Sequence, residues 1–215
     1  LAHIYGAFLE RSALLTSRES YPLLALVVSG GHTALLVIGY DGMARKVGTT
    51  LDDAAGEAFD KAAKILELGY PGGPIIDRLA GEGNPGAYDF PRGLTGGGGR
   101  PVKPENRYNF SFSGVKTALL YTIQKPDYKP SRLHDIVASY QAAVVDVLVQ
   151  KTTAAAAEFA AKTVVLCGGV ACNSRLRQEM AAAVECQGIR LIVAEPRFCT
   201  DNAAMVAGFA YHAVQ

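Results

Sequence analysis

The chain has 215 residues and is nearly neutral, with 21 Lys and Arg against 20 Asp and Glu. Hydrophobic residues make up 49%, which excludes a disordered chain and allows a sizeable packed core. No apolar run approaches the roughly 20 residues that cross a bilayer, so we expect no membrane association. The four cysteines form no CxxC pair and are too few for a disulfide scaffold, which favours a reducing, cytoplasmic setting.

The first part of the chain predicts a helix followed by three strands. Residues 1–16 carry apolar side chains at helical spacing. Two short apolar runs, 23–28 and 34–39, flank a Gly-Gly turn and predict a β-hairpin. Residues 43–49 predict a third strand.

Residues 51–69 predict an amphipathic helix, with Asp52 or Asp53 as its N-cap. Gly69 marks its end, and Pro74 suits the first turn of a second short helix. Residues 81–110 are rich in Gly, Pro and Asn, with four glycines at 96–99, and predict a long loop.

The remainder alternates between helices and strands. The patterns predict helices at 113–124, 131–161, 173–187 and 201–214, and strands at 163–167 and 190–193. The predicted order is three strands joined by hairpin turns, then helices, then an alternation of strand, helix, strand and helix. This order indicates an α/β fold. The order is that of a ribonuclease-H-like lobe of the actin-like ATPase (ASKHA) fold, with a helical insertion.

Two glycine pairs, each at the end of an apolar strand, are candidate nucleotide-binding turns. Ser29-Gly30-Gly31-His32-Thr33 offers backbone N–H groups and the Ser29 and Thr33 hydroxyls to an anion. Gly168-Gly169 precedes a helix that begins near Asn173, where free N–H groups suit phosphate. Alone, the first motif favours an ordinary hairpin turn, and the second is equally an ordinary turn with Asn173 as a helix N-cap. Together, two such loops at strand ends indicate a nucleotide site.

Two further candidates are weaker by pattern. Asp60, the Gly72-Gly73 turn and Asp77 could hold ribose hydroxyls, although Asp60 could equally form an exposed pair with Lys64. His3 and Asp201, both expected on helices, are suitable ligands for iron or zinc, but two ligands are too few for a firm site.

A loop with basic and aromatic side chains could track nucleic acid. Its aromatic rings could instead anchor the loop to the core, and the two interpretations are compatible. The side chains concerned are Arg92, Arg100, Lys103, Arg107 and Lys116, with Tyr108, Phe110 and Phe112 between them. The sequence has no HExxH, GxSxG or Walker A motif, and no clear general base; this favours transfer chemistry by positioning.

Several longer strings carry a resemblance to one family. The chain is similar, nearly throughout and in order, to the universal tRNA threonylcarbamoyladenosine transferases, formerly called O-sialoglycoprotein endopeptidases. The strings are VSGGHT at 28–33, LDDAAGEAFDKAAKILELGYPGGP at 51–74, FSFSGVKTA at 110–118, GGVACNSRLR at 168–177 and TDNAAM at 200–205.

The resemblance implies a two-lobed actin-like fold and transfer of threonylcarbamoyl from its adenylate to N6 of adenosine 37 in tRNAs reading ANN codons. It implies one divalent metal, iron before zinc, with His3 and Asp201 as ligands, and threonylcarbamoyl-adenylate or ATP/AMP as nucleotide. By position it assigns the adenylate to these residues: Val27, Val28, Ser29, Gly30, Gly31, Asp60, Gly73, Asp77 and Asn173.

The resemblance also predicts that the chain is truncated at its N-terminus. The first of the family's two metal-ligating histidines would lie just before Leu1, and the family's N-terminal stretch with its own phosphate loop is also missing. Residues 1–20 are then a helix remaining from the first lobe, 21–200 the second lobe, and 201–215 a helix returning toward the first. The expected partners are tRNA, a small accessory paralogue of the same fold and a P-loop ATPase.

Three alternatives stay open from the residues alone. An ATPase or kinase of the actin-like superfamily would act on the γ-phosphate. A metalloprotease is disfavoured because HExxH is absent. A non-catalytic lobe that binds a partner would expose an apolar patch.

Overall fold

The computed structural model describes residues 1–96 and 101–213 as a mixed α/β structure around one five-stranded sheet. The strand order is β3-β2-β1-β4-β5. β1, β2 and β3 pair antiparallel, whereas β1, β4 and β5 run parallel. The strands are β1 (Leu23–Val28), β2 (Thr33–Ile38), β3 (Ala44–Thr49), β4 (Thr163–Cys167) and β5 (Arg190–Val193). All five strand predictions are confirmed.

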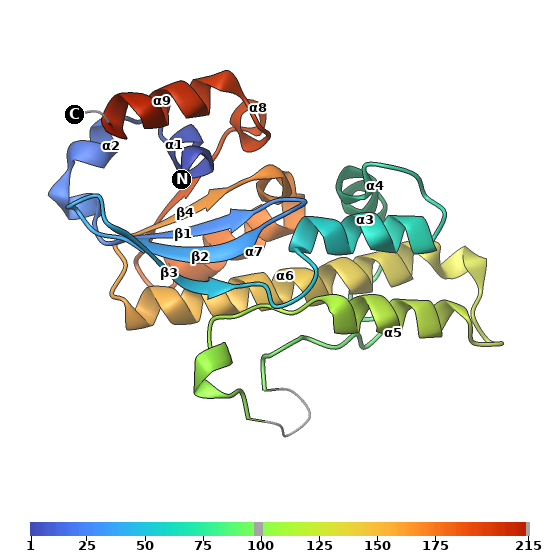
Figure 1. The fold of residues 1–215 in the computed structure, drawn as a ribbon. Coiled ribbons are helices and arrows are strands. Elements are labelled where there is room, and N and C mark those ends of the chain that lie inside the picture. Colours follow the sequence, from blue (N-terminus) through green and yellow to red (C-terminus); the bar gives the residue numbers. More distant parts are fainter. Residues whose placement is uncertain (97–100, 214–215) are drawn as a thin grey trace.

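Helices cover both faces of the sheet (Figure 1). α1, α8 and α9 lie on one side, and α6 and α7 on the other. The longer helices are α3 (Ala55–Ile65), α4 (Gly72–Ala80), α5 (Ser113–Ile123), α6 (Leu133–Glu158), α7 (Ser174–Glu185) and α9 (Ala203–Ala213). The shorter ones are α1 (Ala2–Gly6), α2 (Ala13–Thr16), α8 (Pro196–Cys199) and the 3₁₀ turns η1 (Arg18–Ser20), η3 (Pro104–Asn106), η4 (Pro130–Arg132) and η5 (Gly169–Cys172).

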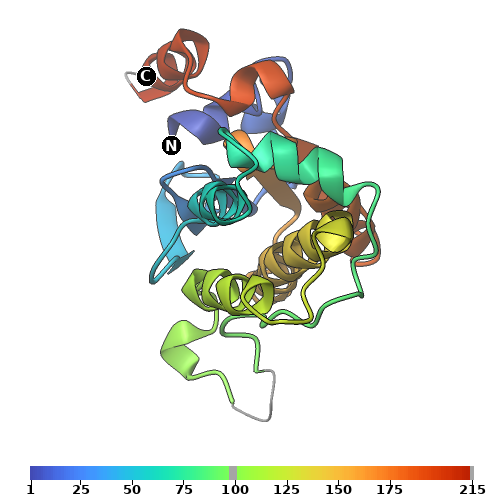
Figure 2. The same cartoon turned by 90° about the vertical axis from the view of Figure 1, so that its right-hand side faces the viewer.

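The sheet and a group of helices share one hydrophobic core. β1 is central and covered on both faces, so Leu24 and Leu26 are completely buried, each stabilising the fold by about 1.5–3 kcal/mol. α3, α4 and α5 extend beyond the carboxyl end of β1, and α6 runs below the sheet, α3 and α4, with α5 on its other side (Figure 1). In Figure 2, α3, α5 and α6 are seen nearly end-on, side by side.

The predicted helix over residues 1–16 is wrong in its extent. α1 ends at Gly6, and α2 begins at Ala13 after the exposed Glu10–Ser12 segment. This break lets the segment turn, so that Leu15 packs on the core while its carbonyl accepts a hydrogen bond from Tyr21 Oη (2.9 Å). Tertiary contacts therefore outweigh local helical periodicity.

Neither Asp52 nor Asp53 caps α3. The N-cap is Ala54, and the Ala55 N–H instead donates to the buried Thr33 Oγ1 on β2 (2.8 Å). Asp52 accepts hydrogen bonds from the Phe112 N–H and the Ser111 hydroxyl. Asp52 therefore binds the segment before α5, and Asp53 pairs with Lys61 of α3 and Lys116 of α5 rather than capping the first turn of α3.

The other helix predictions agree with the structure in type and differ at their ends. α4, α5, α6 and α7 lie within or close to the predicted ranges. α3 ends at Ile65, before Gly69, and α9 starts at Ala203 after the unpredicted α8. Within residues 1–96 and 101–213, no helix combines the length and apolar character needed to cross a membrane.

Candidate functional site at the carboxyl edge of the sheet

The two predicted Gly-Gly turns lie together because β1 and β4 are parallel neighbours. Val27 pairs with Cys167 at the last registered position, so both chains leave the sheet at the same edge. Gly168 has φ +95°, and a Cβ there would lie 2.2 Å from the Val28 carbonyl oxygen. Only glycine allows the two strand ends to approach this closely.

Three helices begin around these turns. The Gly56 N–H in the first turn of α3 donates to the Ser29 carbonyl (3.2 Å). The first residue of α4, Gly72, donates its N–H to Asp60 Oδ1 (2.7 Å). The first residue of α7, Ser174, donates its N–H to Asp77 Oδ2 (3.0 Å) and its hydroxyl to Asp77 Oδ1 (2.8 Å). The predicted aspartates thus fix helix starts against one another.

Asn173 is the N-cap of α7, as predicted, and is buried. Its Oδ1 accepts from the Leu176 N–H (2.9 Å), and its Nδ2 donates to Gln141 Oε1 on α6 (2.8 Å). Gln141 was not predicted from the sequence, because nothing local indicates that a residue within an Ala/Val-rich helix orients the cap.

Four glycines present open backbone at this edge. A Cβ added at Gly30, Gly31, Gly73 or Gly169 would meet no atom within 4 Å. The Ser29 turn is closed by its own bonds, since the Ser29 N–H donates to the His32 carbonyl (2.8 Å) and the His32 N–H donates to Ser29 Oγ (3.1 Å). Open glycine backbone beside helix N-termini is suited to an anionic group such as phosphate.

The structure corrects one expected ligand in this turn. Thr33 was expected to offer its hydroxyl to an anion, but it is buried and accepts the Ala55 N–H. Val28 is likewise fully buried within β1. Of this motif, the glycine backbone and the partly exposed Ser29 remain open to a ligand.

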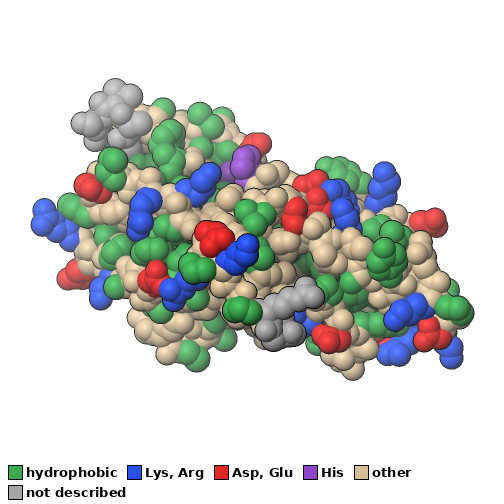
Figure 3. All heavy atoms as spheres, turned by 60° about the horizontal axis from the view of Figure 1, so that its bottom comes forward, with side chains coloured by type: hydrophobic (Ala, Val, Ile, Leu, Met, Phe, Trp, Pro, Cys, Tyr) green, Lys and Arg blue, Asp and Glu red, His purple; other side chains and the backbone are tan. Residues whose placement is uncertain are grey.

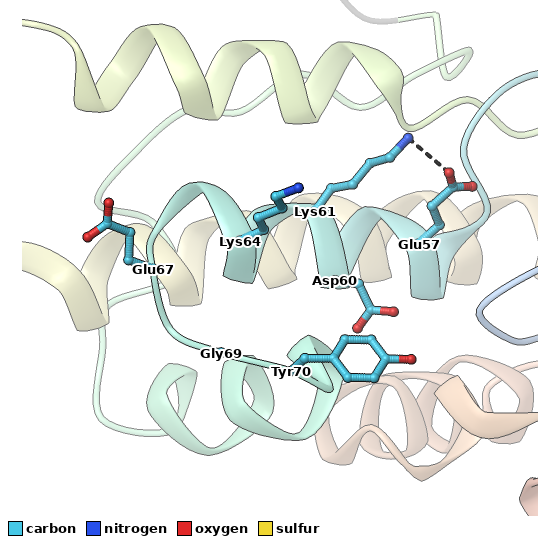
Figure 4. A pocket seen from close by; sticks show the side chains of 7 residues that line it. All are labelled: Glu57, Asp60, Lys61, Lys64, Glu67, Gly69 and Tyr70. Carbon is cyan, nitrogen blue, oxygen red and sulfur yellow. Dashed lines mark ion pairs between the residues drawn. The ribbon is translucent and has the colours of Figure 1, made fainter.

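Asp60 borders a hollow of about 460 Å³ on the outer side of α3. Figure 4 shows its carboxylate pointing toward the ring of Tyr70, while Lys61 and Lys64 point to the other side. Asp60 holds the Gly72 N–H, so it is not simply the solvated partner of Lys64. Lys61 instead pairs with Asp53 (2.6 Å) and Glu57 (2.9 Å).

Asp53 lies near these turns and pairs with two lysines. Partial burial opposes its ionisation, but hydrogen bonds and charge from Lys61 and Lys116 outweigh it and lower its pKa. The two ammonium groups come from α3 and α5, at 2.6 Å and 3.2 Å from the carboxylate. Asp53 therefore stays ionised and joins these helices.

The predicted metal ligands also lie close together, at a different corner. His3 Nε2 on α1 is 3.4 Å from Asp201 Oδ1, although about 200 residues separate them in sequence. Asp201 precedes α9 rather than lying on a helix, and its side chain is 93% exposed. His3 Nδ1 is buried without a hydrogen-bond partner. Within the described residues, no group of three or more His, Cys, Asp or Glu side chains gathers around a common point.

The basic and aromatic loop does not present stacking rings. Tyr108, Phe110 and Phe112 are buried, which supports the interpretation that they anchor the loop to the core. Arg92 pairs with Asp146 and Arg107 with Glu158, and Figure 3 shows basic and acidic side chains interspersed over this face. The further predicted residue Arg100 lies outside the described residues.

A family model described as TsaD, tRNA N6-adenosine threonylcarbamoyltransferase, matches residues 1–208. The chain belongs to this family. Curated relatives of the same name include one from Geotalea uraniireducens, 51% identical over 208 residues, which cover 96% of this chain and 57% of the relative. Another, from Chlorobium phaeobacteroides, is 47% identical over 213 residues, covering 98% and 61%.

The TsaD relatives are longer than this chain, which spans about 57 to 61% of the length of these two. A crystal structure of T. kodakarensis HypF aligns with a TM-score of 0.53 over 76% of this chain and 21% of that one. At 19% identity, the alignment shows similarity of fold alone.

Proposed function

We propose that this TsaD chain belongs to an enzyme that transfers threonylcarbamoyl from threonylcarbamoyl-adenylate to N6 of adenosine 37 in tRNAs reading ANN codons. Family membership over residues 1–208 supports this transferase rather than an ATPase or kinase of the same superfamily. The chain's own contribution is the adenylate-binding edge formed by the two glycine turns.

The observation that carries the proposal is the convergence of open glycine backbone with the N-termini of α3, α4 and α7. Gly30, Gly31 and Gly169 surround the strand ends, and Gly73 lies in the first turn of α4. We propose that the adenylate phosphate binds at these N–H groups, where the positive ends of the helix dipoles favour an anion. Asp60 and Asn173 then lie beside the ribose and base, and the leaving AMP is stabilised without a covalent intermediate.

The His3–Asp201 pair fits part of a metal site. An imidazole and a carboxylate 3.4 Å apart, together with the unpartnered buried His3 Nδ1, suit iron or zinc. Bound there, the metal would act as a Lewis acid toward the carbamoyl oxygen. The residues' own role is to fix where that oxygen lies relative to the glycine turns.

The wider setting follows from the same proposal. We assign the chain the ribonuclease-H-like lobe of an ASKHA fold for residues 21–200, with residues 1–20 and 201–215 belonging to the other lobe. The close packing of α1 on α9 supports grouping these two ends. Its partners are tRNA, a small paralogue of the same fold and a P-loop ATPase, and its location is the cytoplasm.

The proposal is tested by calorimetric titration of a non-hydrolysable threonylcarbamoyl-adenylate analogue, with Gly73→Ala and Gly114→Ala as a matched pair. Both glycines are the second residue of a helix, and a Cβ at either meets nothing within 4 Å, so both variants fold. Only Gly73 lies at the proposed phosphate site. We expect at least about tenfold weaker binding for Gly73→Ala and no change for Gly114→Ala.

Asn173 provides a second arm. Asn173→Ala removes the cap and the amide, whereas Asn173→Ser retains a capping oxygen. Loss of binding in both variants, with the fold of Asn173→Ser intact, assigns the amide to the ligand. Equal binding by wild type, Gly73→Ala and both Asn173 variants would contradict the proposed site.

A further inference from the structure

Two cysteines meet between the glycine-turn edge and the Asp201 segment. Cys172 is the last residue of η5 and is exposed, whereas Cys199 is the last residue of α8 and is completely buried. η5 and α8 are in direct contact. Burial, followed by the neighbouring Cys172 side chain, raises the pKa of the Cys199 thiol to about 12. Figure 1 shows α8 near the carboxyl end of β4, from which η5 follows.

Arg177 holds the two segments that carry these thiols. Its guanidinium donates to the Ala171 carbonyl in η5 and to the Ala194 carbonyl (3.0 Å) before α8. The Cys199 thiol also donates toward Ala194 O (3.4 Å). One guanidinium therefore holds the backbone next to Cys172 and the backbone before α8 together.

We propose that Cys172 and Cys199 form a peroxide-sensitive, reversible disulfide that ties η5 to α8. The exposed Cys172 sulfur attacks one oxygen of hydrogen peroxide, giving a sulfenic acid and water. The Cys199 sulfur then attacks the sulfenic sulfur and displaces a second water. Two thiols lose two electrons and two protons in total, and the peroxide is reduced to two waters.

The crosslink joins the two predicted sites. Asn173, the cap at the glycine turns, directly follows Cys172, and Asp201 lies two residues after Cys199. Oxidation therefore adds a covalent link between the adenylate edge and the Asp201 segment, whereas reduction by a thiol leaves only the Arg177 hydrogen bonds between them. The disulfide itself does not depend on the transferase function, so its test is independent of activity.

Cys186 and Cys167 make the assignment specific. Cys186 is an exposed thiol near the end of α7 and serves as the matched control for accessibility. Cys167 is completely buried at the end of β4, where its thiol faces the Leu26 carbonyl. An oxidant in solution reaches Cys172 and Cys186, but only Cys172 has Cys199 beside it.

The experiment treats the chain with hydrogen peroxide, blocks free thiols by alkylation, and maps disulfides by tandem mass spectrometry after trypsin. Cys167 and Cys172 share the tryptic peptide 163–175, so fragmentation within that peptide distinguishes them. We expect a Cys172–Cys199 link that dithiothreitol removes. It should be lost in Cys172→Ser and formed to the same extent in Cys186→Ser.

Three outcomes would overturn the proposal. One is a link from Cys199 to Cys167 rather than Cys172. Another is oxidation of Cys172 that stops at sulfenic or sulfinic acid although Cys199 is reduced. The third is crosslinking only between molecules, in which Cys186→Ser abolishes the product. Native circular dichroism of each serine variant before oxidation shows that a missing link is not due to a lost fold.

Discussion

The carboxyl edge of β1 and β4 and the His3–Asp201 corner differ in how the chain holds them. At the edge, adjoining strands, three helix starts and a buried Asn173 fix every turn through backbone contacts. At the corner, two side chains meet across 3.4 Å, and one of them is 93% exposed. A tightly packed residue at the edge, such as Gly168, therefore contributes to the fold, whereas the exposed Asp201 side chain contributes little to it.

The largest expected effect is a difference in unfolding free energy between substitutions at the adjacent glycines Gly168 and Gly169. Gly168→Ala places a Cβ 2.2 Å from the Val28 oxygen at φ +95°, and we expect a loss of about 3 kcal/mol or more in unfolding free energy. Gly169→Ala, which meets nothing within 4 Å, should change it by less than about 0.5 kcal/mol. Urea unfolding measures both, and similar values would mean that the strand ends are not in close contact.

The next effect depends on pH. Asp53→Asn removes the charge that joins Lys61 and Lys116, and we expect a loss of about 2 kcal/mol at pH 7. Because the pKa of Asp53 in the folded state lies below its ordinary value of 3.8, this stability is present above that pH and is lost as pH falls through the lowered pKa.

The difference in stability between wild type and Asp53→Asn should therefore shrink as the pH falls from about 5 to about 2. The exposed Asp127 is the control, and Asp127→Asn should follow the wild-type profile throughout. If the difference in unfolding free energy stayed constant across this pH range, the charge of Asp53 would make no contribution to stability.

A smaller effect tests how α4 holds the start of α7. Asp77→Ala should lower the unfolding free energy by about 1 kcal/mol, because Ser174 loses two acceptors. In a double-mutant cycle with Ser174→Ala, we expect a coupling of about 0.5–1 kcal/mol. If the effects of the two single substitutions simply add, the Asp77–Ser174 contact does not couple α4 to α7, and the prediction is wrong.

The smallest expected effect on stability is at the other site. Asp201→Ala should change the unfolding free energy by less than about 0.5 kcal/mol, because the side chain is exposed. In the proposed enzyme it should nevertheless abolish transfer of threonylcarbamoyl to tRNA. Transfer at the wild-type rate by a folded Asp201→Ala protein would refute the metal-ligand assignment.

The sequence predicted elements whose signal is local. β1 and β4 are short apolar runs bounded by glycines, and a fully covered strand needs no other pattern. The sequence did not show that Gly168 is crowded and Gly169 is open. That difference depends on the Val28 carbonyl, which lies about 140 residues earlier in the chain. The predicted capping of α3 by Asp52 or Asp53 was wrong for the same reason. The hydroxyl of Thr33, on β2, accepts the Ala55 N–H at the start of α3.

The site was predictable to a similar degree. Motif positions such as Asp60 and Asn173 were found from their glycine neighbours, but their partners were not. Gly72 N–H and Gln141 are brought to them by packing between helices. The sequence left two interpretations open for Tyr108 and Phe110, because an aromatic residue in a polar loop has the same sequence signal whether it contacts a ligand or the core; both rings are buried.

The length of α6 has a consequence for the motions of this molecule. Its 26 residues run under the sheet and under α4, and residues from Ile136 to Leu148 are almost all buried. If α6 moved away from the sheet, it would also leave α4, and the buried side chains beneath both would be exposed to solvent. Amide hydrogens in the middle of α6 should therefore exchange with solvent only through global unfolding, whereas those at the glycine turns exchange through local opening.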